Sequence, residues 1–212
     1  MSEENLVTNS ESENKTKKIK IGDIIFYSIL ILVFAFTVFT TTFWFSSIKI
    51  QQTSMLPTFE PNDVVLLDKL SSYSRGDVIV FNHDENEDFI KRVIAVEGDT
   101  VYSIDGEVYV EYYNENELVT EKVNEYYLNE QKSTYLEYDF GVGIVDIPRT
   151  TISAGCIYVL GDNRRVSVDS RDIGEIKKDK VKGVVHEFWI KNKSVTTNVF
   201  SFFENIFTSC KN

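Results

Sequence analysis

The chain has 212 residues, of which 42% are hydrophobic, a size that suits one folded domain with an anchor or two very small domains. Its formal net charge of −11 argues against a nucleic-acid partner, because phosphate binding requires clustered Lys and Arg. The two cysteines, Cys156 and Cys210, and the two histidines, His83 and His186, lack the spacing of a metal site or of a disulfide framework. We therefore expect no metal.

An uncharged run rich in Ile, Leu, Val and Phe extends from residue 24 to residue 45. A helix of that length covers the roughly 30 Å hydrocarbon core of a bilayer. A cleaved signal peptide has a shorter apolar region and a small-residue exit site, and a buried core helix is usually shorter and amphipathic. The sequence thus predicts one transmembrane helix over 21–45, preceded by a polar, disordered tail over 1–20.

The lysines near this run predict its orientation. Cations concentrate on the cytoplasmic side of a membrane span. We expect a single-pass protein of the cell membrane, with a cytoplasmic N-terminus and an extracytoplasmic domain held close to the lipid bilayer. Four lysines precede the run and one follows it closely: Lys15, Lys17, Lys18 and Lys20, then Lys49.

Residues 46–194 are predicted to form a mostly β, antiparallel domain, because short strand-like runs alternate with turn signals and no long amphipathic helix separates them. Asp105-Gly106 is typical of a two-residue hairpin turn. The Tyr-, Glu- and Asn-rich segment 111–139 is interpreted as a solvated insertion that carries a hairpin. The predicted strands lie at 64–67, 78–81, 89–96, 101–110 (interrupted by the turn), 157–160 and 184–190.

The C-terminal segment 195–212 carries aromatic and aliphatic residues with helical spacing up to Phe207. It is too short for a second full span and suits a short amphipathic helix. Packing against the domain and contact with the membrane interface both remain open.

Lys91 is unusual within the strand predicted over 89–96. With an alternation of two residues it shares a face with Phe89 and Val93, whereas Arg92 points to the opposite, equally apolar face. Burial lowers the pKa of a lysine, and a neutral amine beside a hydroxyl is a general base. On the strand pattern alone, a lysine that snorkels from a sheet edge to pair with a carboxylate is the better interpretation.

Two further peptides carry residues that could act together with Lys91. Ser54 lies in Gln51–Thr58, shortly after the predicted span, where a loop would leave its backbone N–H free as an oxyanion donor. The peptide 161–172 is rich in Asp and Arg and is typical of a loop held by bidentate ion pairs. Within that peptide, Ser167 is the residue able to contact and orient the lysine.

Four peptides occur in the order and approximate spacing of the signal peptidase boxes, and together with the anchor they extend from about residue 24 to 174. On these residues the chain resembles bacterial type I signal peptidase, a membrane-anchored serine protease with a lysine base and a mixed-β fold. A lysine rather than a histidine in the third box resembles the bacterial and not the endoplasmic-reticulum type. The boxes are Ser54-Met55-Leu56-Pro57-Thr58, Arg75–Phe81, Lys91–Asp99 and Gly161–Arg171.

The resemblance implies that Ser54 is the nucleophile and Lys91 the general base, without any cofactor. It implies that Ser167 hydrogen-bonds the lysine, and that the oxyanion hole uses the Ser54 N–H together with Gln52, where relatives tend to have a small residue. The implied substrates are secretory preproteins with small residues before the cut. Four residues are implied to form a salt-bridged support: Asp162, Arg164, Asp169 and Arg171.

The main alternative is a non-proteolytic assembly factor for surface structures built on the same fold. Such a protein would be expected to lose the serine or the lysine, and this chain has both. A self-cleaving repressor with the same pair would be cytoplasmic and without an anchor, which the run at 24–45 argues against.

Overall fold

The computed structural model describes residues 20–84, 87–128, 135–136 and 145–209. They fall into two compact units that divide between Thr40 and Thr41. The first unit consists of most of helix α1, and the second contains the sheets and the remaining helices. Each unit is described by itself.

Helix α1 extends over Ile21–Phe43 and has 23 residues. Asp23 is the one charged residue in it, and the stretch Ile21–Thr40 has a mean hydropathy of 2.3 with its side chains exposed. At about 1.5 Å per residue the helix is long enough to cross a bilayer. By length and composition α1 is therefore a candidate membrane span. It ends two residues earlier than expected, because a strand begins at Phe45.

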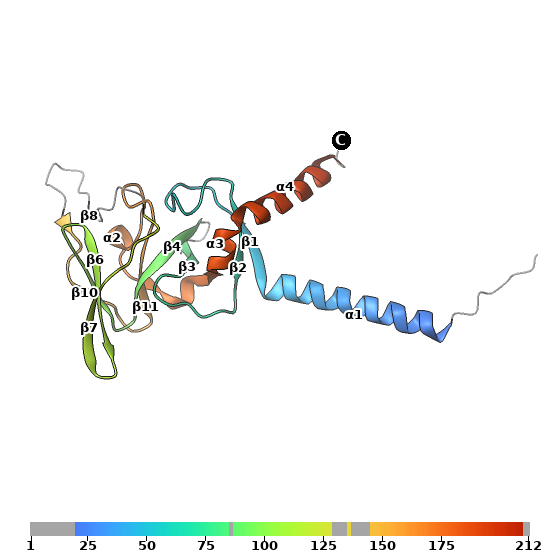
Figure 1. Ribbon diagram of the computed structural model, residues 1–212, viewed down its shortest axis with the longest axis horizontal. Helices are drawn as coiled ribbons and strands as arrows, with labels where there is room; N and C mark the ends of the chain where they lie inside the picture. The colour runs from blue at the N-terminus through green and yellow to red at the C-terminus, as the bar shows by residue number, and fades with distance from the viewer. Residues whose placement is uncertain (1–19, 85–86, 129–134, 137–144, 210–212) are drawn as a thin grey trace, which may run out of the picture. The chain divides into compact units, whose positions relative to one another are not determined.

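The second unit is built from antiparallel sheets, which confirms the predicted fold class. Among the described residues the larger sheet has the strand order β1-β2-β13-β3-β4-β11-β12, and the smaller has β10-β5-β6-β7. Strands β8 and β9 pair separately. In chain order the elements of this unit are β1 (Phe45–Lys49), β2 (Val64–Asp68), β3 (Val78–Asp84), β4 (Glu87–Val96), β5 (Thr100–Ile104), β6 (Glu107–Asn114), β7 (Glu117–Lys122), β8 (Tyr135–Leu136), β9 (Val145–Asp146), β10 (Thr150–Thr151), β11 (Cys156–Leu160), α2 (Ser170–Ile173), β12 (Ile176–Lys177), a 3-10 turn at Lys178–Lys180, β13 (Val181–Val185), α3 (Glu187–Lys191) and α4 (Lys193–Ser209) (Figure 1).

Two tight hairpins account for the smaller sheet. Asp105 and Gly106 join β5 to β6 with φ of 52° and 77°, and Glu115 and Asn116 join β6 to β7 with φ of 47° and 73°. Positive φ at both central residues matches the right-handed twist of the flanking strands. The hairpin expected within 111–139 is present as β6–β7, while 129–134 and 137–139 lie outside the described residues.

Both faces of the larger sheet are buried, which explains why its strands are apolar on both sides. Val78 and Val80 of β3 pack with the residues around Met55, whereas Ile79 and Phe81 pack with those of β11 and β13 on the other face. A third cluster joins the smaller sheet to β4 and β11. Strand β4 therefore lies in the interior, where any polar side chain on it is desolvated.

The strand predicted over 184–190 is wrong in its second half. Strand β13 ends at Val185 and helix α3 begins at Glu187. Trp189 and Ile190 pack against the core around Met55, and Trp189 N–H donates to His186 C=O at 2.9 Å. The run of apolar residues was thus a strand followed by a helical turn, a distinction that periodicity alone does not make in so short a run.

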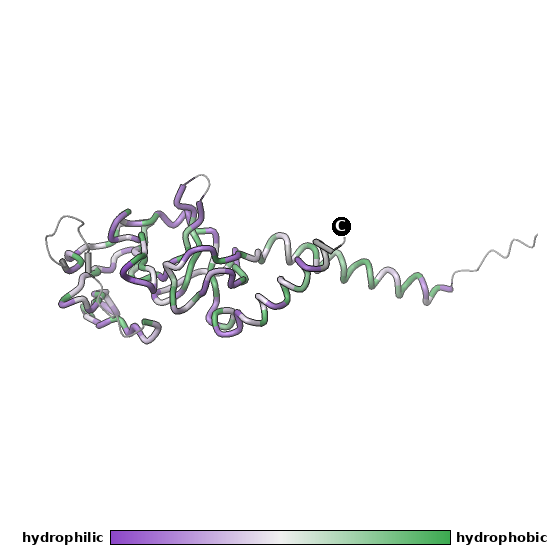
Figure 2. Tube along the Cα trace, turned by 90° about the horizontal axis from the view of Figure 1, so that it is seen from above, coloured by the Kyte–Doolittle hydropathy of each residue, from purple (hydrophilic) through white to green (hydrophobic). Residues whose placement is uncertain are grey.

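The C-terminal aromatic segment contains α4, a helix of 17 residues. Hydrophilic and hydrophobic residues alternate along α4, whereas α1 is hydrophobic over most of its length (Figure 2). The first turn of α4 packs against β2.

Candidate active site

Ser54 lies in a turn between β1 and β2, and the residues that follow it are packed into the hydrophobic core. Met55 and Phe59 are both fully buried, and Phe59 N–H donates to Met55 C=O at 3.0 Å. From the other side, Asn163 N–H donates to Ser54 C=O at 3.0 Å, and its side-chain amide donates to Thr53 C=O at 3.1 Å. The turn is thereby fixed on two sides, and the position of the Ser54 hydroxyl with it.

Lys91 lies in the middle of β4 and is 1% exposed. Its ammonium group donates to Ser54 Oγ at 2.7 Å, and Ser54 is itself buried. The Nζ atom lies 4.9 Å from the centroid of the Phe89 ring, on the face that the strand alternation predicts. The structure therefore brings the two residues of the predicted pair into direct contact.

Burial lowers the pKa of Lys91 from 10.5 to about 8. Desolvation is the largest cause, because the interior stabilises an ammonium less than water does. The negative charges of Asp169 and Asp162 oppose it, and the positive charge of Arg171 adds to it. Roughly a tenth of the amines are then neutral at pH 7, a fraction that a pKa of 10.5 would make negligible.

Asp162 forms a buried ion pair beside Ser54 and Lys91, and its partner is Arg92 rather than Arg164. The Arg92 guanidinium donates to both carboxylate oxygens, at 2.9 and 2.6 Å, and to Gly76 C=O at 2.8 Å. Thr58, four residues after the serine, donates its hydroxyl to Asp162 at 2.5 Å. Arg92 was noted in the sequence as a cation on an apolar face, but its role as partner of Asp162 was missed.

Asp169 and Arg171 form the second buried ion pair, at 2.8 and 2.9 Å. Asp169 also caps helix α2 by accepting from Arg171 N–H, and it accepts from Gly161 N–H at 2.9 Å. These two residues therefore lie together as predicted. Their contacts connect the end of β11 to the loop that follows it.

Arg164 pairs with Glu125, a residue that the sequence placed in the solvated insertion. The Nε of Arg164 donates to Gly161 C=O at 2.9 Å, and the guanidinium also contacts the Tyr127 hydroxyl. Burial strongly raises the pKa of this tyrosine. The segment after β7 thus belongs to the support of the site, and nothing in the local sequence marks it as such.

Ser167 is buried close to the pair, but its Oγ has no hydrogen-bond partner among the described residues. The expected bond to Lys91 is therefore not made here. Gly161 explains how closely the peptides meet, since a Cβ at that position would lie 2.0 Å from Ser167 Oγ and 2.6 Å from Ser54 C=O. A glycine is required for this approach.

Gln52, the expected second oxyanion donor, is exposed, and its amide donates to Glu87 at 2.8 Å. The Ser54 backbone N–H donates to no acceptor among the described residues. Of the two expected donors, the backbone group is thus available and the side chain is engaged elsewhere.

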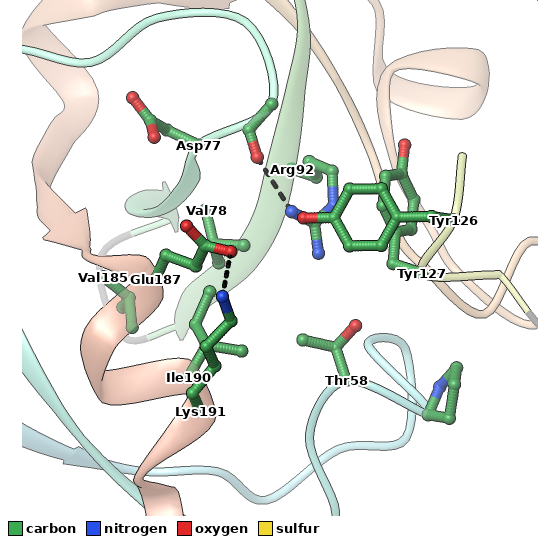
Figure 3. Close-up of a pocket in the computed structure, with 12 residues that line it drawn as sticks. Thr58, Asp77, Val78, Arg92, Tyr126, Tyr127, Val185, Glu187, Ile190 and Lys191 are labelled. Carbon is green, nitrogen blue, oxygen red and sulfur yellow. Dashed lines mark hydrogen bonds and ion pairs between the residues drawn. The ribbon is translucent and has the colours of Figure 1, made fainter. Parts of the chain in front are cut away.

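A pocket of about 450 Å³ lies beside Arg92. Helix α3 forms one wall with Ile190 and the Glu187–Lys191 ion pair, and Tyr126 and Tyr127 stand opposite (Figure 3). Ser54 and Lys91 do not line it. No cluster of metal-ligating side chains occurs in the part of the chain that the structure describes.

A serine hydroxyl at hydrogen-bonding distance from a buried lysine amine, on an antiparallel β scaffold, is typical of serine hydrolases that use a lysine base. Comparison with known proteins agrees. The sequence profile of the family described as signal peptidase, peptidase S26, matches residues 21–190. The chain belongs to this family, whose members are serine proteases.

Individual relatives carry the same name. Signal peptidase I of Bacillus caldolyticus is 35% identical over 156 residues, which cover 69% of this chain and 81% of that protein. Signal peptidase IB of Staphylococcus aureus is 36% identical over 151 residues, with 64% and 73% covered. The crystal structure of a signal peptidase I from Enterococcus faecalis is 25% identical, covers 55% of this chain and 98% of its own, and has a TM-score of 0.40.

Proposed function

We propose that this chain is a membrane-anchored signal peptidase in which Ser54 is the nucleophile and Lys91 the general base. The observation that carries the proposal is the buried contact of 2.7 Å between Lys91 Nζ and Ser54 Oγ. With a pKa of about 8, Lys91 is neutral in a fraction of the molecules near physiological pH. In that state the Ser54 O–H donates to the amine instead.

The reaction follows from these groups. As the hydroxyl attacks the scissile carbonyl, its proton passes to Nζ, and the Ser54 N–H donates to the developing oxyanion. The ammonium then gives its proton to the departing amine, which leaves an ester between the signal peptide and Ser54. Lys91, neutral again, takes a proton from water as that water attacks the ester, and it returns the proton to Ser54 Oγ as the signal peptide leaves with a free carboxyl group. Gln52 would serve as a second oxyanion donor after exchanging its Glu87 partner for the substrate.

The edge of β4 supports binding of an extended substrate. Pairing with β11 begins at Arg92 and continues to Val96, while pairing with β3 extends back to Glu87. Residues Glu87–Ile90 thus have one edge without a strand among the described residues, directly before the lysine. We propose that a preprotein adds its main chain to this edge, with small side chains before the cut.

Anchoring and orientation are part of the proposal. Helix α1 would span the membrane, since its composition and length suit the hydrocarbon core. The lysines that precede it would keep the N-terminus in the cytoplasm and place Ser54 outside, near the bilayer surface.

Cleavage of a preprotein with an Ala-x-Ala signal, by the full chain in detergent or lipid, tests the proposal. The product masses should report a cut after the small-residue motif, and Ser54→Ala and Lys91→Met should each abolish it. Thr53→Ala is the matched control, because that side chain is exposed and adjacent. Wild-type protein that is folded but inactive, or Lys91→Met protein that still cleaves, would refute the assignment.

A further inference from the structure

Helix α4 lies beyond the residues that the family profile matches, which end at 190. Family membership therefore gives no account of its role. The side chains of α4 indicate its role, because they form three distinct stripes along the helix.

One stripe fastens the helix to the domain. Thr196 is 6% exposed and donates its hydroxyl to Val64 C=O at 2.6 Å, while Val64 N–H donates to Thr197 Oγ1 at 2.9 Å. Lys193 forms an ion pair with Asp63 at 2.8 Å. The first turn of α4 is thus bound to the start of β2.

A second stripe is apolar and open. Val195, Val199, Phe202 and Phe203 follow the spacing of a single helix face and are 58%, 47%, 61% and 50% exposed. These four residues are called the apolar stripe below. No described part of the chain covers it, although the helix beneath is attached to the domain. The third stripe is polar and exposed, and contains Ser194, Asn198, Ser201 and Asn205.

The chain itself indicates what covers the apolar stripe. Helix α4 is bound to β2, and β2 pairs with β1, which begins two residues after α1 ends. Lys49, at the far end of β1, pairs with Val64 and lies only about 13 Å along the strand from Phe45. Figure 1 shows α4 leaving the domain next to β1 and β2.

We propose that α4 is a second membrane contact, which lies in the bilayer interface with its apolar stripe in the acyl-chain boundary. The inference rests on the proposed anchoring of the chain through α1. Burial of apolar side chains, and not attraction to lipid charges, would drive the insertion. The two charged residues among the described part of the helix already form ion pairs with the domain: Lys193 with Asp63, and Glu204 with Lys49 at 3.8 Å. Two attachments would restrain rotation of the catalytic domain about α1 and hold Ser54 at a fixed height.

Lipid quenching of a fluorophore tests this in the full chain. In a background of Cys156→Ser and Cys210→Ser, single cysteines replace Val199 on the apolar stripe or Ser201 on the polar stripe, and an environment-sensitive dye is attached. The third labelled variant, Trp44→Cys, reports on the end of α1. Each protein is reconstituted in phosphatidylcholine vesicles whose acyl chains are brominated.

The label at position 199 should be quenched at least threefold more than the label at 201, in vesicles without anionic lipid. Equal or absent quenching at both positions, with position 44 quenched, would overturn the inference while leaving the anchor intact. Absent quenching at position 44 would overturn the anchoring, and this inference with it. A blue shift at 199 that depends on protein concentration and not on bromine would assign the stripe to a second copy of the chain instead.

Discussion

Replacement of Lys91 by Met should stabilise the domain at neutral pH while abolishing cleavage. Lowering the pKa of a lysine from 10.5 to about 8 corresponds to about 3 kcal/mol of unfavourable burial when the group is protonated. Met fills a similar volume without that charge, and the substitution removes one hydrogen bond to Ser54, which contributes about 1 kcal/mol. The free energy of unfolding should therefore rise by about 2 kcal/mol at pH 7.

The pH dependence separates this explanation from a simple packing effect. Between pH 8 and 10.5 the unfolded chain retains a proton on Lys91 that the folded chain has lost, so wild-type stability gains with rising pH in that window. Below pH 8 both states are protonated, and the unfavourable contribution is constant. The advantage of Lys91→Met should accordingly shrink by about 3 kcal/mol from pH 7 to pH 11.

Urea titration of the full chain in detergent micelles measures this difference, with the fluorescence of the partly buried Trp189 as signal. Ser54→Ala is the control, since it is inactive but keeps the buried amine, and it should follow the wild-type pH dependence. In parallel, the acid limb of single-turnover cleavage should have an apparent pKa near 8. A stability difference that does not vary with pH, or a limb near 10.5, would refute the argument from desolvation.

Substitutions at three further positions test the surroundings of the Ser54–Lys91 pair. Gly161→Ala places a Cβ 2.0 Å from Ser167 Oγ, so cleavage should fall at least tenfold by displacement of the neighbouring loops, as a kinetic assay would show. Arg171→Met should destabilise the domain by about 3 kcal/mol, because it leaves the carboxylate of Asp169 buried without its partner, and should move the acid limb to higher pH. Arg171→Lys keeps the charge and should leave the limb in place. Glu125→Gln removes the negative charge that opposes the buried Arg164 and should lower the urea midpoint clearly; an unchanged midpoint would contradict a structural role for this ion pair.

Much of the fold was predictable because its signals are local. The apolar runs of β3 and β4 and the Asp105-Gly106 turn depend on neighbours within a few residues, and the structure has the strands and the hairpin there. The segment 184–190 was misassigned because its last residues, 188–190, are apolar, and a short apolar run is compatible with a strand and with a helix. What decides it is packing against the core around Met55, which no local pattern reports.

In the candidate site, too, the residues with a local signal were predicted and the pairings between distant residues were not. Lys91 was found because a cation inside an apolar strand is itself an anomaly, and Ser54 because its peptide matches a family box. The pairing of Arg164 with Glu125 joins residues far apart in sequence, and no spacing rule links them. The pairing of Asp162 with Arg92 likewise joins residues that are 70 positions apart, and it was missed for the same reason.

The arginines of the support have an electrostatic role besides their contacts. Asp162 and Asp169 are buried carboxylates near Lys91, and each of them favours the ammonium form. If they were unopposed, their charges would counteract the desolvation that lowers the pKa of the lysine. Arg171 opposes Asp169 directly, and Arg92 satisfies Asp162 through a bidentate pair on the opposite face of β4. The scaffold thus fixes its loops with the buried carboxylates of Asp162 and Asp169 and still holds a partly neutral lysine beside them, because each of these two carboxylates has its own arginine.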